Sequence, residues 1–289
     1  MLKNITKGTR SGVFLLLLVI PSFVSQAQAL KSLVNAEKAF AQTSVDKNTR
    51  AAFLDFFNDS TLAFANGEPR YGRPDWEKRE ANNNYLFWWP VYADIAAAGN
   101  FGYTTGPAVF GPDKSTKEVK GGIYYASVWK KNANGQWRVL ADMGSSTYDP
   151  AENLTAFSTT AKPSKASKKK GSSGGLALRD LERELEVKLN EKRTSFDPAY
   201  FSNEGRIHRR GIPPVISKAS IEKLTEPQKY HFQYGGSETA SSNDMAFSYG
   251  LVKITSVKDG KEVVTSACYM RVWKNVDGKW NIVLDVIGG

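Results

Sequence analysis

Cysteine and histidine are almost absent from this chain of 289 residues, and both shortages restrict its chemistry. The single cysteine, Cys268, excludes a disulfide within the chain and lies in an apolar strand pattern typical of a buried, inert thiol. The two histidines, His208 and His231, have no sequence neighbour that would complete a catalytic triad or a metal set. We therefore predict neither metal nor cofactor, and interpret both histidines as surface or pocket-edge residues.

Long apolar runs are also scarce. The run Val13 to Ile20 is too short to cross a bilayer core of about 30 Å as a helix, which takes about 20 residues. Basic residues precede this run, and the small-residue site Ala27-Gln28-Ala29 follows it. This order is typical of a cleaved secretory signal. We therefore expect cleavage after Ala29, no membrane anchor after cleavage, and an exported protein that is periplasmic or secreted.

The formal net charge of +10 is concentrated in two segments. The first 29 residues carry three basic side chains and no acid, and segment 156–175 carries five lysines and no acid, which leaves +2 for the rest. Segment 156–175 also has too few large apolar side chains to form a core, so we interpret it as part of a disordered basic linker. With its charge located there, the high pI does not predict a nucleic-acid partner.

One pattern occurs twice in the remaining sequence. Segments 122–142 and 267–285 share Tyr-x-x-Val-Trp-Lys, a turn on Asn-Gly or Asp-Gly, and Trp-x-x-x-x-Asp. This agreement indicates an internal duplication. We therefore predict a signal peptide at 1–29, a first repeat at 30–150, a linker at 151–175 and a second repeat at 176–289.

Within each repeat, helical patterns precede strand patterns. Leu33, Glu37, Phe40 and Ala41 keep a helical spacing in the first repeat, as four leucines between 178 and 189 do in the second. Aromatic and β-branched runs separated by turn residues follow. We predict an α+β fold with two tandem cone-shaped domains, each with two or three N-terminal helices packed on a curved antiparallel sheet.

Segments 36–41, 52–53, 68–72, 89–106 and 128–130 resemble the nuclear-transport-factor-2-like superfamily, and within it the SnoaL-like (ketosteroid-isomerase-like) branch known as a domain of unknown function. The resemblance implies the cone fold, which carries isomerases, dehydratases and cyclases as well as binding or dimerisation modules.

In the superfamily's isomerases a catalytic Asp follows an Asp-x-Thr segment. Matching Asp59-Ser60-Thr61-Leu62 to that segment puts the base at Phe64, and a gapless alignment of the repeats, with Leu62 on Ile207, puts its counterpart at Arg209. Neither can take a proton from carbon, so we do not expect isomerase chemistry by that route.

The duplication keeps two carboxylates, Asp142 and Asp285. Strict alternation along their strands sets a continuous apolar row against the core and each Asp on the opposite, mixed face. We therefore expect both in an exposed or ion-paired role.

Dense aromatic residues on the sheets suggest core packing and, in a cone, the lining of an apolar pocket. We predict ligand-binding contacts from both repeats: Trp89, Tyr92, Tyr103, Tyr125, His208, Arg209, Tyr249 and Tyr269.

Our leading hypothesis is an exported, non-catalytic tandem module that binds a small apolar molecule or mediates association, by docking of its repeats or as a homodimer. One alternative is a lyase, isomerase or cyclase that acts on a small hydrophobic substrate in the second repeat. Another is a module for self-association alone.

Overall fold

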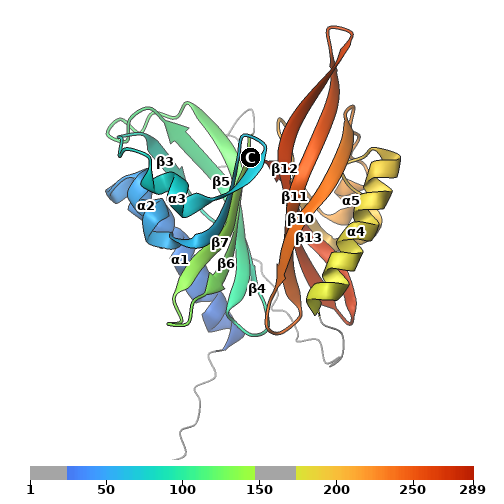
Figure 1. The fold of residues 1–289 in the computed structure, drawn as a ribbon. Coiled ribbons are helices and arrows are strands. Elements are labelled where there is room, and N and C mark those ends of the chain that lie inside the picture. Colours follow the sequence, from blue (N-terminus) through green and yellow to red (C-terminus); the bar gives the residue numbers. More distant parts are fainter. Residues whose placement is uncertain (1–24, 147–173) are drawn as a thin grey trace, which may run out of the picture.

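The computed structural model describes residues 25–146 and 174–289, which form two units that each combine helices with a strongly bent sheet (Figure 1). The predicted signal peptide lies mostly outside the described residues, as does most of the predicted linker. The expected cleavage point after Ala29 falls within the first helix, where Ala29 is buried. Among the described helices, none is long and apolar enough to cross a membrane.

The first unit begins with two helices joined at Asn48, whose side chain accepts a hydrogen bond from the Ala51 amide and so caps the second helix. The strands form a seven-stranded sheet in the order β2-β1-β7-β6-β5-β3, with β4 also paired to β5. Its elements are α1 (Gln26–Asp46), α2 (Thr49–Phe56), β1 (Phe57–Ala65), β2 (Glu68–Tyr71), α3 (Gly72–Glu77), β3 (Tyr85–Trp88), β4 (Tyr92–Ile95), β5 (Phe101–Gly111), β6 (Gly121–Lys131) and β7 (Trp137–Ser146).

The second unit repeats this plan with a six-stranded sheet in the order β10-β11-β12-β13-β8-β9. Its last hairpin turns on Asp277 and Gly278, both with positive φ, as a two-residue type I′ turn requires. Its elements are α4 (Gly174–Lys192), the 3-10 turn η2 (Pro198–Tyr200), β8 (Phe201–His208), β9 (Val215–Ile216), α5 (Lys218–Ile221), β10 (Lys229–Thr239), β11 (Met245–Lys258), β12 (Lys261–Val276) and β13 (Lys279–Gly288).

These units confirm the predicted α+β class with two tandem cones, but the sheets are mixed and not purely antiparallel. In the first unit β1 pairs parallel to β7, and in the second β8 pairs parallel to β13. The first strand of each unit thus closes onto the last and bends the sheet around the helices.

Each sheet contains a β-bulge in its last strand, so the strict inward–outward alternation expected for the side chains of that strand is wrong. In β7 the ladder to β6 skips Leu140, so Val139 packs in the core under the helices while Ala141 belongs to the core shared with the other unit. An extra residue reverses the facing of every side chain beyond it. Asp142 therefore points toward the helices, and the same shift at Val283 turns Asp285 inward in the second unit.

The strand register also corrects the gapless alignment of the repeats. Leu62 pairs with β7 at the position where Arg206 pairs with β13, so these two residues are equivalent. Phe64 consequently matches His208 and not Arg209.

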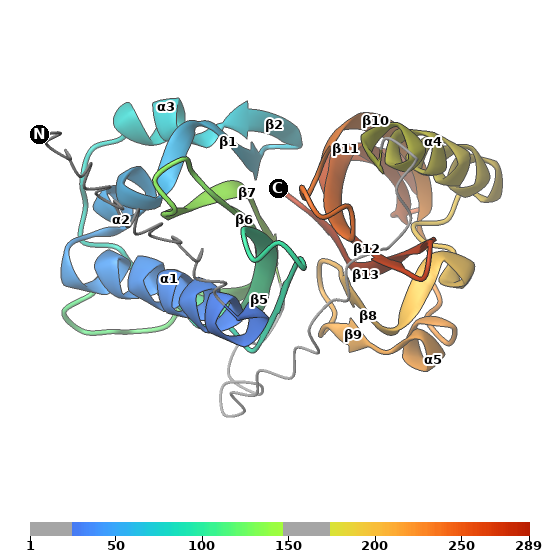
Figure 2. The same ribbon diagram turned by 90° about the horizontal axis from the view of Figure 1, so that it is seen from below.

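The two sheets pack against each other through the faces turned away from the helices, with α1 and α4 on the outer sides (Figures 1 and 2). One hydrophobic cluster draws buried residues from both units, including Tyr103 and Met143 from the first and Phe247 and Met270 from the second. At the rim of this interface the Ala97 amide donates to Asp244 Oδ2 at 2.8 Å.

Candidate functional site

The interior of each cone contains a buried glutamate within the apolar stripe of its long helix. In the first unit Glu37 has no exposed surface and accepts hydrogen bonds from Trp88 Nε1 (2.5 Å), Trp129 Nε1 (2.9 Å) and the Thr104 hydroxyl. These donors offset part of the cost of burying a carboxylate. Burial raises the pKa of Glu37 to about 7, and the hydrogen bonds from Thr104 and Trp88 only partly oppose this rise.

A second carboxyl, Asp142, lies beside Glu37 inside the first cone and adds to the rise of its pKa. The Ser127 hydroxyl on the neighbouring strand donates to Asp142 Oδ2 at 2.6 Å. Burial raises the pKa of Asp142 to about 6, and Ser127 only partly opposes the shift. Near neutral pH these pKa values leave both carboxyls partly ionised, so together they favour a nearby positive charge.

The second cone keeps the glutamate but neutralises it. Glu182 has no exposed surface and accepts from Trp273 Nε1 (2.7 Å), the Ser248 hydroxyl and Arg271 Nη1 (2.8 Å). Arg271 also donates from Nε to Asp285 Oδ2 at 3.0 Å. Burial disfavours the charged guanidinium, but the two carboxylates hold the pKa of Arg271 above its ordinary value.

Arg209 extends this ion-pair network. Its Nη1 donates to Asp285 Oδ1 at 3.1 Å, and its Nε donates to the Ser195 hydroxyl at 3.1 Å and lies 3.8 Å from Glu226 Oε1. Asp285 is fully buried between two arginines. The ion-paired role expected for Asp285 is confirmed, whereas its expected position on the mixed outer face is wrong.

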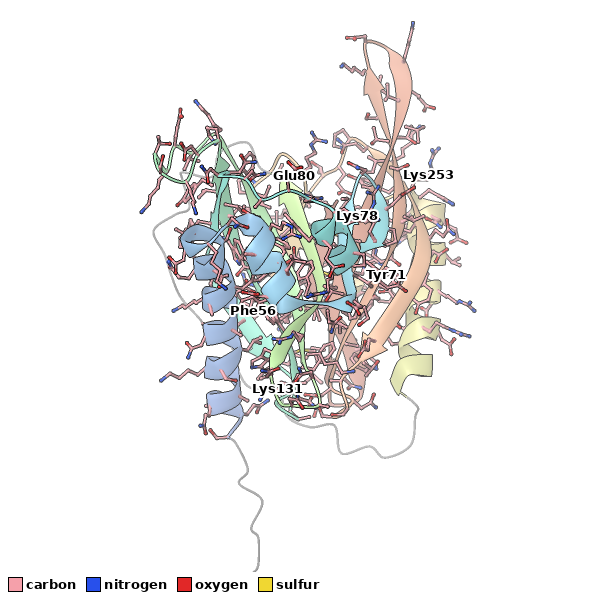
Figure 3. All side chains as sticks on the ribbon, turned by 60° about the vertical axis from the view of Figure 1, so that its left-hand side comes forward. Phe56, Tyr71, Lys78, Glu80, Lys131 and Lys253 are labelled. Carbon is pink, nitrogen blue, oxygen red and sulfur yellow. The ribbon has the colours of Figure 1, made fainter. Side chains whose placement is uncertain are left out.

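A pocket of about 610 Å³ opens in the first unit, between the first turns of α2, the chain around and after α3, and the ends of β3 and β5. Figure 3 shows this side of the first unit, with Glu80 in the segment that follows α3. Trp76 stacks on Phe53 at 4.3 Å and carries the Arg79 guanidinium 4.2 Å from its ring centroid. The lining combines apolar rings with polar and charged groups: Thr49, Arg50, Trp76, Arg79, Glu80, Ala81, Asn82, Asn84, Tyr85, Leu86, Phe110 and Gly111.

The structure does not bring the eight predicted ligand residues together in one site. Tyr125 belongs to the core of the first cone, and Tyr269 to that of the second. Arg209 is part of the second cone's ion-pair network. Four residues lie at the interface between the units: Tyr92 and Tyr103 are buried in the shared cluster, His208 is buried against the first unit, and Tyr249 packs on the cluster half-buried. Trp89 is half-buried in the segment between β3 and β4, with its ring 5.8 Å from that of Phe87.

His208 is not the surface or pocket-edge residue that the sequence suggested. Only 3% of it is exposed, and its ring lies 5.6 Å from that of Tyr124 in the other unit. Burial, reinforced by the charges of Arg206 and Arg209, lowers the pKa of His208 to about 3. It is therefore neutral near pH 7 and faces away from the interior of the second cone. His231 is exposed, as expected.

Sequence reasoning named Glu37 only for its helical spacing and assigned no functional role to Glu37, Glu182 or Arg271. One signal was present, because Glu37 and Glu182 each occupy an apolar position of a helical stripe, where an acid must find buried donors. Within the described residues, no group of three or more His, Cys, Asp and Glu side chains could hold a metal ion.

Each unit has the fold that the resemblance implies, with helices packed inside a bent sheet. No family model matches the chain, and no curated protein matches it. It is similar in structure to a ketosteroid-isomerase-like protein from Erwinia carotovora atroseptica (17% identity, TM-score 0.32, covering 39% of this chain and 93% of that one).

Two further similar structures are an NTF2-like protein of unknown function from Shewanella oneidensis and an NTF2-like protein with a cystatin-like fold from Novosphingobium aromaticivorans. The first is 15% identical, with a TM-score of 0.30, and covers 39% of this chain and 96% of that one. The second is 11% identical, with a TM-score of 0.30, and covers 39% and 84%.

Proposed function

We propose that the protein is a small-molecule-binding module whose ligand occupies the pocket of the first unit. The observation that carries this proposal is the pocket itself, because its volume of about 610 Å³ lies in the range typical of small-molecule sites. Its apolar wall comes from Trp76, Tyr85, Leu86 and Phe110, and Arg50 and Arg79 supply positive charge. This lining suits a ligand with flat apolar rings and one anionic group.

The second unit takes a supporting role in this proposal. Arg271 forms buried ion pairs with Glu182 and Asp285 in its interior, and its sheet completes the shared hydrophobic cluster with the first unit. This shared cluster supports pairing of the two units within one chain, in preference to a homodimer through the same faces. Export, which the first 29 residues predict, is part of the proposal and would place the ligand outside the cytoplasm.

Binding is tested with anilinonaphthalene sulfonate, a fluorescent probe that has flat apolar rings and one sulfonate. Phe110→Ser and Arg79→Gln change exposed pocket residues without opening the core, and each should weaken binding several-fold. The matched controls are Val257→Ser and Arg210→Gln, both at exposed positions of the second unit. Equal affinity of all four variants and the parent would contradict the proposed pocket. Independently of the probe, native mass spectrometry of the full chain would give the mass of any natural ligand that remains bound.

A further inference from the structure

The second cone contains a complete receptor for a guanidinium group, which Arg271 of the same chain occupies. Glu182 and Asp285 bind the guanidinium nitrogens at 2.8 and 3.0 Å. The ring centroid of Tyr269 lies 4.3 Å from Arg271 Cζ, and that of Phe232 lies 4.9 Å from it. Two carboxylates and two aromatic faces are the groups that hold a planar organic cation.

The first cone has the same receptor without the arginine. The strand pairing matches Ser127 to Arg271, because each pairs directly with the retained aspartate, Asp142 or Asp285. The same registers match Tyr125 to Tyr269, since both pair with the glycine of the preceding long strand. Serine therefore stands where the second unit has a cation.

The other two groups of the receptor are also retained. Glu37 accepts from Trp129 as Glu182 accepts from Trp273. Trp88 occupies the position of Phe232, as their pairing with the next strand shows. The first unit thus has both carboxylates and both aromatic rings.

We propose that the interior of the first cone binds a small organic cation, a guanidinium or an amine, at the place that the Arg271 head group fills in the second cone. This site is separate from the pocket proposed above, so the inference goes beyond that function. Its ligand class follows from the receptor that the second unit displays.

Asp142 supplies the direct contact in this site. Trp88 donates a hydrogen bond to one carboxylate oxygen of Glu37, and Trp129 and Thr104 donate to the other. Glu37 therefore contributes mainly its charge to the site. Asp142 uses Oδ2 for Ser127, and it is only half-buried, so water still reaches part of its surface. A cation beside Asp142 would also lie near the Tyr125 ring. The Tyr125 hydroxyl is buried without a hydrogen-bond partner, as is that of Tyr269, whose ring face serves the guanidinium.

Proton competition gives the site a distinct pH dependence. The raised pKa values of about 7 for Glu37 and about 6 for Asp142 mean that both carboxyls hold protons at pH 5 and lose them by pH 8. A cation binds the ionised form, so its affinity should rise across this interval. Binding at pH 6.5 should release protons into the buffer.

The test uses n-propylguanidinium, which carries the head group of an arginine side chain, and isothermal titration calorimetry on the full chain at pH 8. Asp142→Asn keeps the shape of the side chain and should weaken binding about tenfold or more. Ser127→Arg installs the arginine of the second unit and should abolish binding. Glu222→Gln, at an exposed position, is the control and should bind as the parent does.

Each outcome decides the proposal. Saturable binding that Asp142→Asn weakens and Glu222→Gln preserves supports it. No binding by the parent at millimolar probe, or equal binding by the parent and Asp142→Asn, overturns it. If Ser127→Arg fails to fold, the Asp142→Asn comparison still gives the answer. Binding of the sulfonate probe should be unchanged in Asp142→Asn, which keeps this test independent of the first pocket.

Discussion

Across the sheet of the first unit, one row of paired residues contains Thr104, Ser127 and Asp142, and the same row of the second unit contains Ser248, Arg271 and Asp285. Both rows face a helix-borne glutamate that accepts from a tryptophan. Only the second row carries a cation.

This single difference gives the two interiors different properties. In the second unit Arg271 joins two carboxylates in a closed, neutralised network that includes Arg209. In the first unit burial raises the pKa of Glu37 to about 7 and that of Asp142 to about 6, and the Asp142 charge adds to the rise for Glu37. The two units thus share a polar framework, and the residue at one position, Ser127 or Arg271, decides whether a cation pairs with the aspartate.

Among the substitutions that test this difference, replacement of Arg271 should change the unfolding free energy most. Arg271→Ser gives the second row the composition of the first and leaves Glu182 and Asp285 buried without their common partner. Breaking a buried ion pair in this way costs about 3–5 kcal/mol of unfolding free energy. Urea denaturation followed by circular dichroism measures the loss. Arg210→Ser, at an exposed position, should stay within about 0.5 kcal/mol of the parent. A loss below about 1 kcal/mol for Arg271→Ser would show that the network does not stabilise the second unit.

The two duplicated aspartates should respond oppositely to the same substitution at pH 8. Asp285→Asn removes the negative charge that pairs with Arg209 and Arg271, and should lower the unfolding free energy by about 3 kcal/mol. Asp142→Asn removes a half-buried charge that no cation of the described residues pairs with, and should add about 1–3 kcal/mol to the unfolding free energy. The pKa of Asp142 rises from 3.8 to about 6 on folding, so its contribution to stability falls as pH increases from about 4 to about 6. The gain from Asp142→Asn should therefore fade below pH 4. If both substitutions changed the unfolding free energy in the same direction at pH 8, the two aspartates would not differ in the way proposed here.

The sequence predicted the architecture well because that architecture follows from repeated patterns. Helical spacing, strand alternation and the Asp277-Gly278 turn each have a local cause, and together they gave the α+β class and the tandem cones. The parallel pairing of β1 with β7 has no local signature, since it joins segments about 80 residues apart.

The candidate site was harder to predict because it depends on one-residue shifts. The bulges at Leu140 and Val283 reverse the facing of Asp142 and Asp285, and strict alternation cannot anticipate a bulge. The ring of buried His208 lies against Tyr124 of the other unit, a contact between residues far apart in the chain. The sequence around Arg271 has the pattern of an ordinary strand, and only the strand register pairs Arg271 with Asp285.

The central claim is that the first cone holds a fully buried carboxyl, Glu37, and a half-buried one, Asp142, with no cation from the described residues between them. Carboxyl ¹³C NMR titration tests this claim most directly. Comparison of the parent with Glu37→Gln and Asp142→Asn assigns the two signals. The account predicts midpoints near pH 7 for Glu37 and near pH 6 for Asp142, and a lower midpoint for Glu37 once Asp142 is replaced, since the two charges repel. Midpoints below pH 5 for both carboxyls would contradict it and would show that the first interior is already neutralised.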